Sequence, residues 1–486
     1  RVGLNMRIIG NDPSVPRQEH AVASGTLTNG KTIVVNTDGT VSVIVGVDGG
    51  AGTPVVFESA NTQNTSVTYD ANAQKVVIVY KDNGNSNYGT AIVGTVSGTS
   101  ISFGSPVVFI SSGVNDPIAT YHVAAQKIVI AYQDVIGDAH GEAIVGTVSG
   151  TSISFGSIAT FNSATTSKIS IGYDANAQRV VIAYKDEGNS DRGTAIVGTV
   201  SSTSISFGSE VVFNSGGATD HISVVYDANA QKVVIAYRDG ANSNYGTAVV
   251  GTVSGTSISF GSEVVFESAS SIYNSATYHT AAQKIVISYQ DAGNSNFGTA
   301  IVGTVSGTSI SFGTAVVFES ASAAYTKGAY DSTSEKIVIA YRDTGNSNHG
   351  TAIVGTVSGT SISFDSPIVF ETAESNYTCP AYDANAQKIV IAYQDGGNSN
   401  HGTSVVFTVG STNLTSENYI GISRSGAADT KGAIIDTQGA IADNLSGLTA
   451  GQSYFVQTDG TLGTTAADPS VFAGTAVSAT KLIVKG

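Results

Sequence analysis

Residues 226–266 read YDANAQKVVIAYRDGANSNYGTAVVGTVSGTSISFGSEVVF, and close copies of this stretch fill most of the 486-residue chain. The Tyr that opens it, followed by Asp or His, recurs every 52 or 53 residues. A fixed period of about 50 residues with strand-forming content is typical of propeller blades. The sequence therefore predicts an all-β, seven-bladed β-propeller. The seven copies of the marker are Tyr69, Tyr121, Tyr173, Tyr226, Tyr278, Tyr330 and Tyr382.

Each repeat is predicted to form four antiparallel strands. In the first copy we expect them at 65–69, 75–81, 90–96 and 100–109. The second, KVVIVYK, is a β-branched apolar run that suits a strand buried on both faces. The loop at 82–89 is rich in Gly and Asn, and Ser97-Gly98 makes a tight hairpin turn.

The last repeat lacks a copy of the Ser-Ile-Ser-Phe strand that ends the others. A Val-Val-Phe segment ending at Phe57 precedes the first Tyr marker, so we expect residues 40–57 to supply the missing outer strand. Pairing both ends of the array in one blade would leave no open sheet edge. The predicted domains are an N-terminal extension with a hairpin at 1–39, the propeller at 40–410 and a small C-terminal β domain at 411–486.

Composition excludes several classes of protein. Acidic residues outnumber basic ones 37 to 22, which gives a net charge of −15 and argues against nucleic-acid binding. The single cysteine, Cys379, excludes an intrachain disulfide framework. No apolar run reaches the roughly 18 residues that span a bilayer, so membrane insertion is not expected.

Six repeats carry a carboxylate at the mouth of the loop between the second and third strands. The pattern Asp-x-Gly-x-Ser is similar to the Asp-box hairpin of sialidase-like propellers, although Tyr stands where that motif usually has Ser or Thr. A carboxylate there can accept backbone N–H bonds, whereas a calcium loop needs more acidic ligands. We therefore predict structural carboxylates, with no metal and no cofactor. They are Asp82, Asp186, Asp239, Asp291, Asp343 and Asp395.

The segments between blades differ most among the repeats and should lie on the same face as these loops. Variable loops on a constant framework are typical of a binding scaffold; drift of solvent loops is the alternative. Seven residues after the blade-ending Phe, three neighbouring repeats have Tyr273, Tyr325 and Tyr377, and the other four have Asn64, Asp116, Lys168 and Asp220. We predict ligand-binding aromatics on this face, with packing between blades as the alternative. The hairpin loops add Tyr88, Tyr245, Phe297, His349 and His401.

The sequence indicates no catalytic site. None of the seven His residues forms a metal-ligand pair, and no nucleophile-elbow pattern occurs among the many Ser residues. The Arg cluster of a sialidase is missing. A pair of hairpin carboxylates could in principle hydrolyse a glycoside, but those carboxylates already have a structural role. We therefore expect a protein that is not an enzyme.

The repeat at 226–266 resembles the propeller repeats of tailed-phage appendage proteins, especially from marine phages. The ending GLTAGQSYFVQTDGTLGTTAADPSVFAGTAVSATKLIVKG is similar to C-terminal modules of tail-fibre and other virion proteins. The resemblance implies an extracellular virion component, in a tail or capsid appendage, that contacts the host cell. We therefore expect host recognition through one propeller face, with a surface glycan or other receptor and virion proteins as partners, and homo-oligomerisation left open. The alternatives are a purely structural virion component and, less favoured, a polysaccharide-degrading enzyme.

Overall fold

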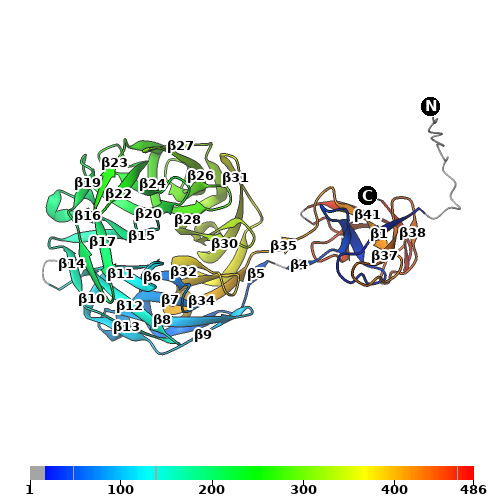
Figure 1. The fold of residues 1–486 in the computed structure, drawn as a ribbon, viewed down its shortest axis with the longest axis horizontal. Coiled ribbons are helices and arrows are strands. Elements are labelled where there is room, and N and C mark those ends of the chain that lie inside the picture. Colours follow the sequence, from blue (N-terminus) through cyan, green and yellow to red (C-terminus); the bar gives the residue numbers. More distant parts are fainter. Residues whose placement is uncertain (1–16, 48, 137–138, 468, 486) are drawn as a thin grey trace. The chain divides into compact units, whose positions relative to one another are not determined.

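The computed structural model describes residues 17–47, 49–136, 139–467 and 469–485. Within that part of the chain the regular structure is β, apart from four three-residue 3-10 turns. The chain forms two compact units: one is Gly50–Val409, and the other combines Arg1–Gly49 with Gly410–Gly486. The first unit holds all seven repeats, which lie around a common centre (Figure 1).

One repeat shows how the sequence folds locally. β20 (Thr219–Asp227), β21 (Lys232–Asp239) and β22 (Tyr245–Ser254) pair in order, all antiparallel. The outer edge is split in two: β23 (Ser257–Phe260) pairs with the end of β22, and the start of β24 (Val264–His279) pairs with its beginning. The fourth strand expected from the sequence is therefore two short strands in one row.

The other repeats follow the same order. Their strands are β6 (Val55–Asp70), β7 (Lys75–Asp82), β8 (Tyr88–Ser97), β9 (Ser100–Phe103), β10 (Val107–His122), β11 (Lys127–Asp134), β12 (Gly141–Ser149), β13 (Ser152–Phe155), β14 (Ala159–Asn162), β15 (Thr166–Asp174), β16 (Arg179–Asp186), β17 (Arg192–Ser201), β18 (Ser204–Phe207), β19 (Val211–Asn214), β25 (Lys284–Asp291), β26 (Phe297–Ser306), β27 (Ser309–Phe312), β28 (Val316–Asp331), β29 (Lys336–Asp343), β30 (His349–Ser358), β31 (Ser361–Phe364), β32 (Ile368–Asp383), β33 (Lys388–Asp395) and β34 (His401–Thr408).

The segments expected as interblade loops are mostly strand. β6, β10, β24, β28 and β32 each run on from the outer edge of one repeat into the innermost strand of the next. In β24, Ser270 still pairs with Tyr245 of its own repeat, and Ser271 already pairs with Asp291 of the following one. The segments break into separate strands only between β14 and β15 and between β19 and β20. The expectation of loops was wrong in these five places because each segment finds ladder partners on both sides.

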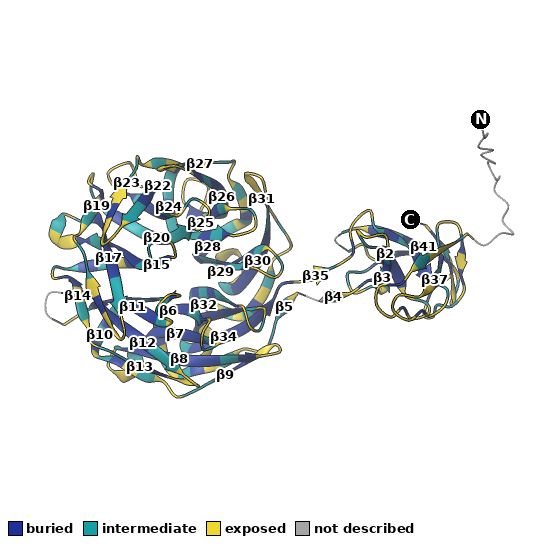
Figure 2. Ribbon diagram, in the orientation of Figure 1, coloured by how far each residue is buried: buried dark blue, intermediate teal, exposed yellow. Residues whose placement is uncertain are grey.

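The core lies between neighbouring repeats. The second strand of each repeat is buried on both faces, as its apolar run predicts, and Figure 2 shows such middle strands in dark blue and the turns in yellow. Phe266, at the end of one outer edge, contacts Tyr289 of the next repeat with ring centroids 5.3 Å apart and Phe312 with centroids 5.7 Å apart. Burial of these rings and β-branched side chains is the main stabilising contribution.

The seventh repeat takes its outer edge from the start of the unit. β34 pairs with β5 (Gly50–Ala51) and with β6, so that Phe407 lies opposite Ala51 and Thr403 opposite Val56. The prediction that residues 40–57 supply this edge is correct for residues 50–57 and wrong for residues 40–47. Those residues belong to the other unit, because Val41–Val43 (β3) pairs with Thr32–Val35 (β2).

A glycine joins the two pieces of the outer edge in six places. A Cβ on Gly208 would lie 1.8 Å from the carbonyl oxygen of Thr256, in the hairpin turn of the next repeat. The same close approach occurs at Gly52, Gly104, Gly156, Gly261 and Gly313. The seventh equivalent position holds Asp365, and the repeat that follows it ends its third strand at Thr408 without such a hairpin turn. The one position with a side chain is therefore the one whose following repeat lacks that hairpin turn.

The second unit corrects the expected division into an N-terminal extension and a separate C-terminal domain. Its first sheet has the order β1-β37-β36-β2-β3, so two C-terminal strands lie between N-terminal ones. The apolar side chains near the N-terminus, Leu27 and Ile33, bury against Ala433 and Ile435, which gives a physical reason for the single unit. Residues 1–16 of the expected extension lie outside the described residues.

The strands of this unit, apart from β2 and β3, are β1 (Gln18–Val22), β4 (Gly46–Val47), β35 (Ser411–Thr412), β36 (Tyr419–Ser423), β37 (Gly432–Asp436), β38 (Ile441–Ala442), β39 (Ser453–Val456), β40 (Leu462–Gly463), β41 (Val471–Ser478) and β42 (Lys481–Val484). The second sheet has the order β38-β42-β41-β39-β40, and β4 pairs with β35. The Asp38-Gly39 turn joins β2 and β3, and the Asp38 carboxylate accepts the backbone N–H of Thr40 at 2.9 Å.

Candidate functional site

Each repeat places one residue in the left-handed backbone region at the same point of its innermost strand. The φ values of these residues lie between 49° and 56°. In β24 the residue is Tyr273, at a break in register between Ile272 and Ser275. Such backbone is uncommon outside Gly and is held by the surrounding structure. We call these residues the seven-residue ring: Asn64, Asp116, Lys168, His221, Tyr273, Tyr325 and Tyr377.

All members of the seven-residue ring line one cavity of about 520 Å³. The next residues along the innermost strands, including Ser66, Ser223 and Cys379, continue its wall. A volume of this size is within the range of small-molecule sites, roughly 300–1,000 Å³. Because every repeat contributes to the wall, the cavity exists only when the repeats are assembled.

Four of the seven members of the ring have aromatic side chains and form its aromatic half. The centroids of Tyr273 and Tyr325 lie 4.9 Å apart, and those of Tyr325 and Tyr377 lie 5.0 Å apart. His221 extends the arc, with its ring centroid 5.4 Å from that of Tyr273. The Arg342 guanidinium carbon lies 4.9 Å from the Tyr325 centroid, a cation–π contact. The three Tyr residues predicted as ligand-binding therefore do come together, and they are half-buried.

One member of the ring differs from the sequence-based expectation. The count from the blade-ending Phe selected Asp220, but the structure places His221 at this position. The extra residue of the fourth repeat lies ahead of the innermost strand, so the count from Phe213 falls one residue short. Counting five residues back from the Tyr marker finds all seven members, including His221.

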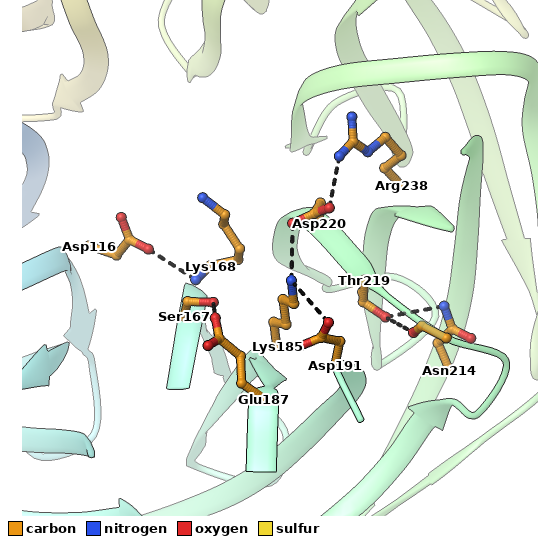
Figure 3. A network of polar contacts seen from close by, with 11 residues as sticks. Asp116, Ser167, Lys168, Lys185, Glu187, Asp191, Asn214, Thr219, Asp220 and Arg238 are labelled. Carbon is orange, nitrogen blue, oxygen red and sulfur yellow. Dashed lines mark hydrogen bonds and ion pairs between the residues drawn. The ribbon is translucent and has the colours of Figure 1, made fainter. Parts of the chain in front are cut away.

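The rest of the ring is polar. The Asp116 carboxylate accepts a hydrogen bond from Asn64 Nδ2 at 3.1 Å and another from the Lys168 backbone N–H at 2.9 Å. Both carboxylate oxygens therefore have a partner. The Lys168 ammonium has no hydrogen bond or ion pair among the described residues, and Figure 3 shows it apart from the carboxylate.

Beneath the ring, serine hydroxyls join neighbouring repeats. Ser223 Oγ accepts the backbone N–H of Ala276 at 2.9 Å, and three other serines do the same for the repeat that follows them. The sixth repeat has Lys327 at this place. Its ammonium cannot accept a hydrogen bond, and its neighbour in the seventh repeat is Pro380, which has no N–H to donate. At this junction the missing acceptor therefore coincides with a missing donor; the second and seventh repeats, with Ile118 and Cys379, also lack the Ser.

Several ionisable groups of the cavity are perturbed by enclosure, among them Tyr273 and Tyr377, whose pKa values burial raises. Burial lowers the pKa of His221 to about 4, so this imidazole is neutral near pH 7. Burial also lowers the pKa of Lys327 and raises that of the Cys379 thiol. The sequence-based prediction did not include Lys168, His221 or Lys327 as site residues. The signal that could have found them is their register with the predicted Tyr residues.

The five aromatic and His residues of the hairpin loops are not in the cavity wall. Each opens a third strand opposite the loop carboxylate, as Tyr245 does opposite Asp239. The hairpins do lie beside the innermost strands, because the carbonyl of Asn244 accepts the N–H of Ser271 in the next repeat. The predicted surface thus divides into a cavity with Tyr273, Tyr325 and Tyr377 and a set of half-buried loop residues outside it: Tyr88, Tyr245, Phe297, His349 and His401.

The loop carboxylates are engaged within their own hairpins. Asp395 accepts the backbone N–H groups of Gly397 at 3.0 Å and Asn398 at 3.1 Å, and Asp82, Asp239, Asp291 and Asp343 make bonds of the same kind. Asp186 opens the equivalent hairpin without a side-chain cap bond. Among the described residues, no group of three His, Cys, Asp or Glu side chains could hold a metal ion. None of the helices in that part of the chain is long and apolar enough to cross a membrane.

A charged cluster lies beside the polar half of the ring. The Asp220 carboxylate accepts Arg238 Nη2 at 2.7 Å and lies 4.0 Å from Lys185 Nζ, which is also 3.6 Å from Asp191 (Figure 3). These pairs satisfy their own charges. They fix the segment that precedes His221 and leave the cavity cations outside the cluster.

No protein-family model matches the sequence, and no curated protein matches it. Solved structures do resemble it. The BP39L lectin from Burkholderia pseudomallei is 9% identical with a TM-score of 0.54, and the match covers 74% of this chain and 99% of the lectin. The β-propeller domain of Cps50 (Swd1) from Myceliophteria thermophila is 8% identical with a TM-score of 0.48, covering 74% and 100%. The periplasmic gluconolactonase PpgL from Pseudomonas aeruginosa is 10% identical with a TM-score of 0.47, covering 74% and 97%. At such identity the likeness concerns the fold alone, and the chain has an all-β fold of the β-propeller type built from internal repeats.

Proposed function

We propose that this chain is an appendage protein of a phage virion whose closed, seven-bladed propeller recognises a glycan of the host surface in its central cavity. The observation that carries the ligand-binding part is the seven-residue ring. Seven nearly identical repeats present seven side chains of five different kinds at one backbone position. The backbone there is constant and the side chains differ, which is the arrangement expected of a recognition surface on a rigid scaffold.

The inference of seven closed blades rests on hydrogen bonds between successive repeats. The hydroxyl of each marker Tyr contacts the turn of the preceding repeat, as Tyr278 accepts the N–H of Asn229 at 3.1 Å. The series returns to its start, because Tyr69 of the first repeat accepts the N–H of Asn385 in the seventh at 3.2 Å. The other members are Tyr121, Tyr173, Tyr226, Tyr330 and Tyr382.

A saccharide is the ligand class that the aromatic half of the ring favours. Half-buried Tyr rings offer an apolar face to the C–H groups of a sugar and a hydroxyl to its oxygens. The polar half of the ring, with Asn64 and Asp116, adds hydrogen-bonding groups across the cavity. That a propeller of similar fold is a lectin is consistent with this choice. The virion assignment rests on the sequence resemblance of the repeats and of the C-terminal segment.

The test uses one substitution that removes a ring without changing the backbone. Asn occupies the Tyr325 position in the first repeat with the same positive φ, so Tyr325→Asn keeps a residue that tolerates this conformation. The matched control is Tyr245→Asn in a hairpin loop outside the cavity. We expect the parent protein and the control to bind fractions of host-surface glycan on an array and to compete with phage adsorption.

The expected result for Tyr325→Asn is at least a tenfold loss of glycan affinity with unchanged thermal unfolding. Equal binding by the two variants would remove the cavity as the recognition site. Failure of the parent protein to bind any glycan fraction, together with capture of other virion proteins through the same face, would favour the purely structural alternative.

A further inference from the structure

Basic side chains outnumber acidic ones in the wall of the cavity. Its wall contains the ammonium groups of Lys168 and Lys327 and the carboxylate of Asp116, whereas His221 is neutral near pH 7. The Asp116 carboxylate already accepts two hydrogen bonds from neighbouring repeats. The cavity therefore has two basic side chains to one carboxylate, in a chain whose net charge is −15.

Neither ammonium group has a hydrogen bond or an ion pair within the part of the chain that the structure describes. Lys168 is exposed at the cavity rim and Lys327 is half-buried one layer further in. A cation in a poorly hydrated site is unfavourable unless an anion compensates it. The lowered pKa of Lys327 follows from this enclosure. Attraction to Asp116 and Cys379 opposes the shift without reversing it.

The other repeats do not have a basic residue at the position of Lys327. Four other repeats have Ser at this position, and its hydroxyl joins two repeats by accepting an N–H. The sixth repeat gives up that bond, and Pro380 in the seventh removes the N–H that would have lacked an acceptor. At this junction the hydrogen bond is thus absent, and a basic side chain lines the cavity instead.

We propose that the cavity ligand is an acidic saccharide, whose sugar ring contacts the Tyr273–Tyr325–Tyr377 arc and whose anionic group is bound by Lys327 and Lys168. The anionic group is a carboxylate or a phosphate ester, since both are recognised by ammonium donors. This inference rests on the proposed function of the cavity. A volume of about 520 Å³ accommodates one or two sugar rings.

The experiment measures dissociation constants of the full chain by titration calorimetry. The probes are glucuronic and galacturonic acid and their short oligosaccharides, the neutral glucose and galactose equivalents, glucose 6-phosphate, and inorganic phosphate. We expect the acidic sugars to bind at least tenfold more tightly than their neutral equivalents, with an affinity that decreases as salt concentration rises. The uronate and sugar-phosphate arms separate the two anionic groups.

Two substitutions test the cations. Lys327→Met keeps the length of the side chain without its charge, and Lys168→Asn uses the residue that the first repeat has at the equivalent positive-φ position. Lys431→Met, at an exposed position of the other unit, is the control. We expect Lys327→Met to remove the preference for acidic over neutral sugars, Lys168→Asn to reduce it, and the control to keep it.

The outcomes distinguish this inference from the proposed function. Binding of neutral sugars as tight as that of acidic ones, with sensitivity to Tyr325→Asn, would overturn the anionic ligand and leave glycan recognition standing. Binding of inorganic phosphate as tight as that of glucose 6-phosphate would also overturn it, because the saccharide would then contribute nothing. Absence of binding by any saccharide, neutral or acidic, would overturn both.

Discussion

The glycine at the split of each outer edge offers a quantitative test of the fold. A Cβ on Gly208 would lie 1.8 Å from Thr256 O, far inside the contact limit of about 3 Å, and the obstructing atom belongs to the backbone. The φ angle of Gly208 lies outside the left-handed region, so alanine suffers only the collision. Overpacking of this kind costs about 1–3 kcal/mol, and the lower entropy of the unfolded chain offsets about 0.4–1 kcal/mol. We therefore expect Gly208→Ala to cost about 1–2 kcal/mol.

The propeller unit spans about 360 residues. An unfolding entropy of about 2.1 cal/mol/K per residue makes each kcal/mol worth roughly 1.3 °C in Tm. To enlarge the effect, the alanine substitution is made in three alternate repeats, at Gly104, Gly208 and Gly313. Independent sites add, so the propeller transition in differential scanning calorimetry should fall by roughly 4–8 °C.

The matched control is Asp365→Ala, at the equivalent position that no hairpin carbonyl approaches. Because this substitution introduces no collision with a hairpin turn, it should lower the Tm far less than the triple variant does. A triple variant that melts with the parent protein would refute the reasoning, since the outer edges would then not pack as closely as the structure has them. An equal loss in the control would refute it as well.

Three further predictions concern closure and pH. Phe57→Ala should lower the free energy of unfolding, measured with denaturant, by about 3–5 kcal/mol. Phe266→Ala should lower it by the same amount, because both rings are buried at equivalent places. A much smaller loss for Phe57→Ala would mean that the N-terminal segment does not complete the last repeat. Tyr69→Phe and Tyr278→Phe should each lower the free energy of unfolding by about 1 kcal/mol, since each hydroxyl accepts one N–H from another repeat. Closure by the Tyr69 bond would be contradicted if Tyr278→Phe lowered stability and Tyr69→Phe did not. The pKa of His221 in the folded protein, about 4, lies below that of an unfolded His, about 6.5. As the pH is lowered, the unfolded state therefore binds the proton first, and the free energy of unfolding decreases between about pH 6.5 and pH 4. His221→Asn should therefore gain roughly 2–3 kcal/mol relative to the parent at pH 4.5 and nothing at pH 7.5, and a pH-independent difference in Tm would argue against a neutral buried imidazole.

The sequence by itself determined the repeat, its period and the strands of each copy. The buried second strand and the Asp-Gly turns could be assigned because local patterns of apolar and turn-forming residues decide them. The same patterns indicated that a segment near Phe57 completes the last repeat. They also placed Tyr273, Tyr325 and Tyr377 at one equivalent position.

Only the tertiary structure decided features that depend on pairing between distant segments. The interrepeat segments became strands because each has ladder partners in two repeats. Residues 18–47 joined the C-terminal strands because Leu27 and Ile33 share one apolar cluster with Ala433 and Ile435. The cavity, with Lys327 beside the Tyr arc, arises from strands of different repeats that converge. The repeat period shows which positions are equivalent, but the hydrogen-bond register and the contacts between repeats are settled only when the chain is folded.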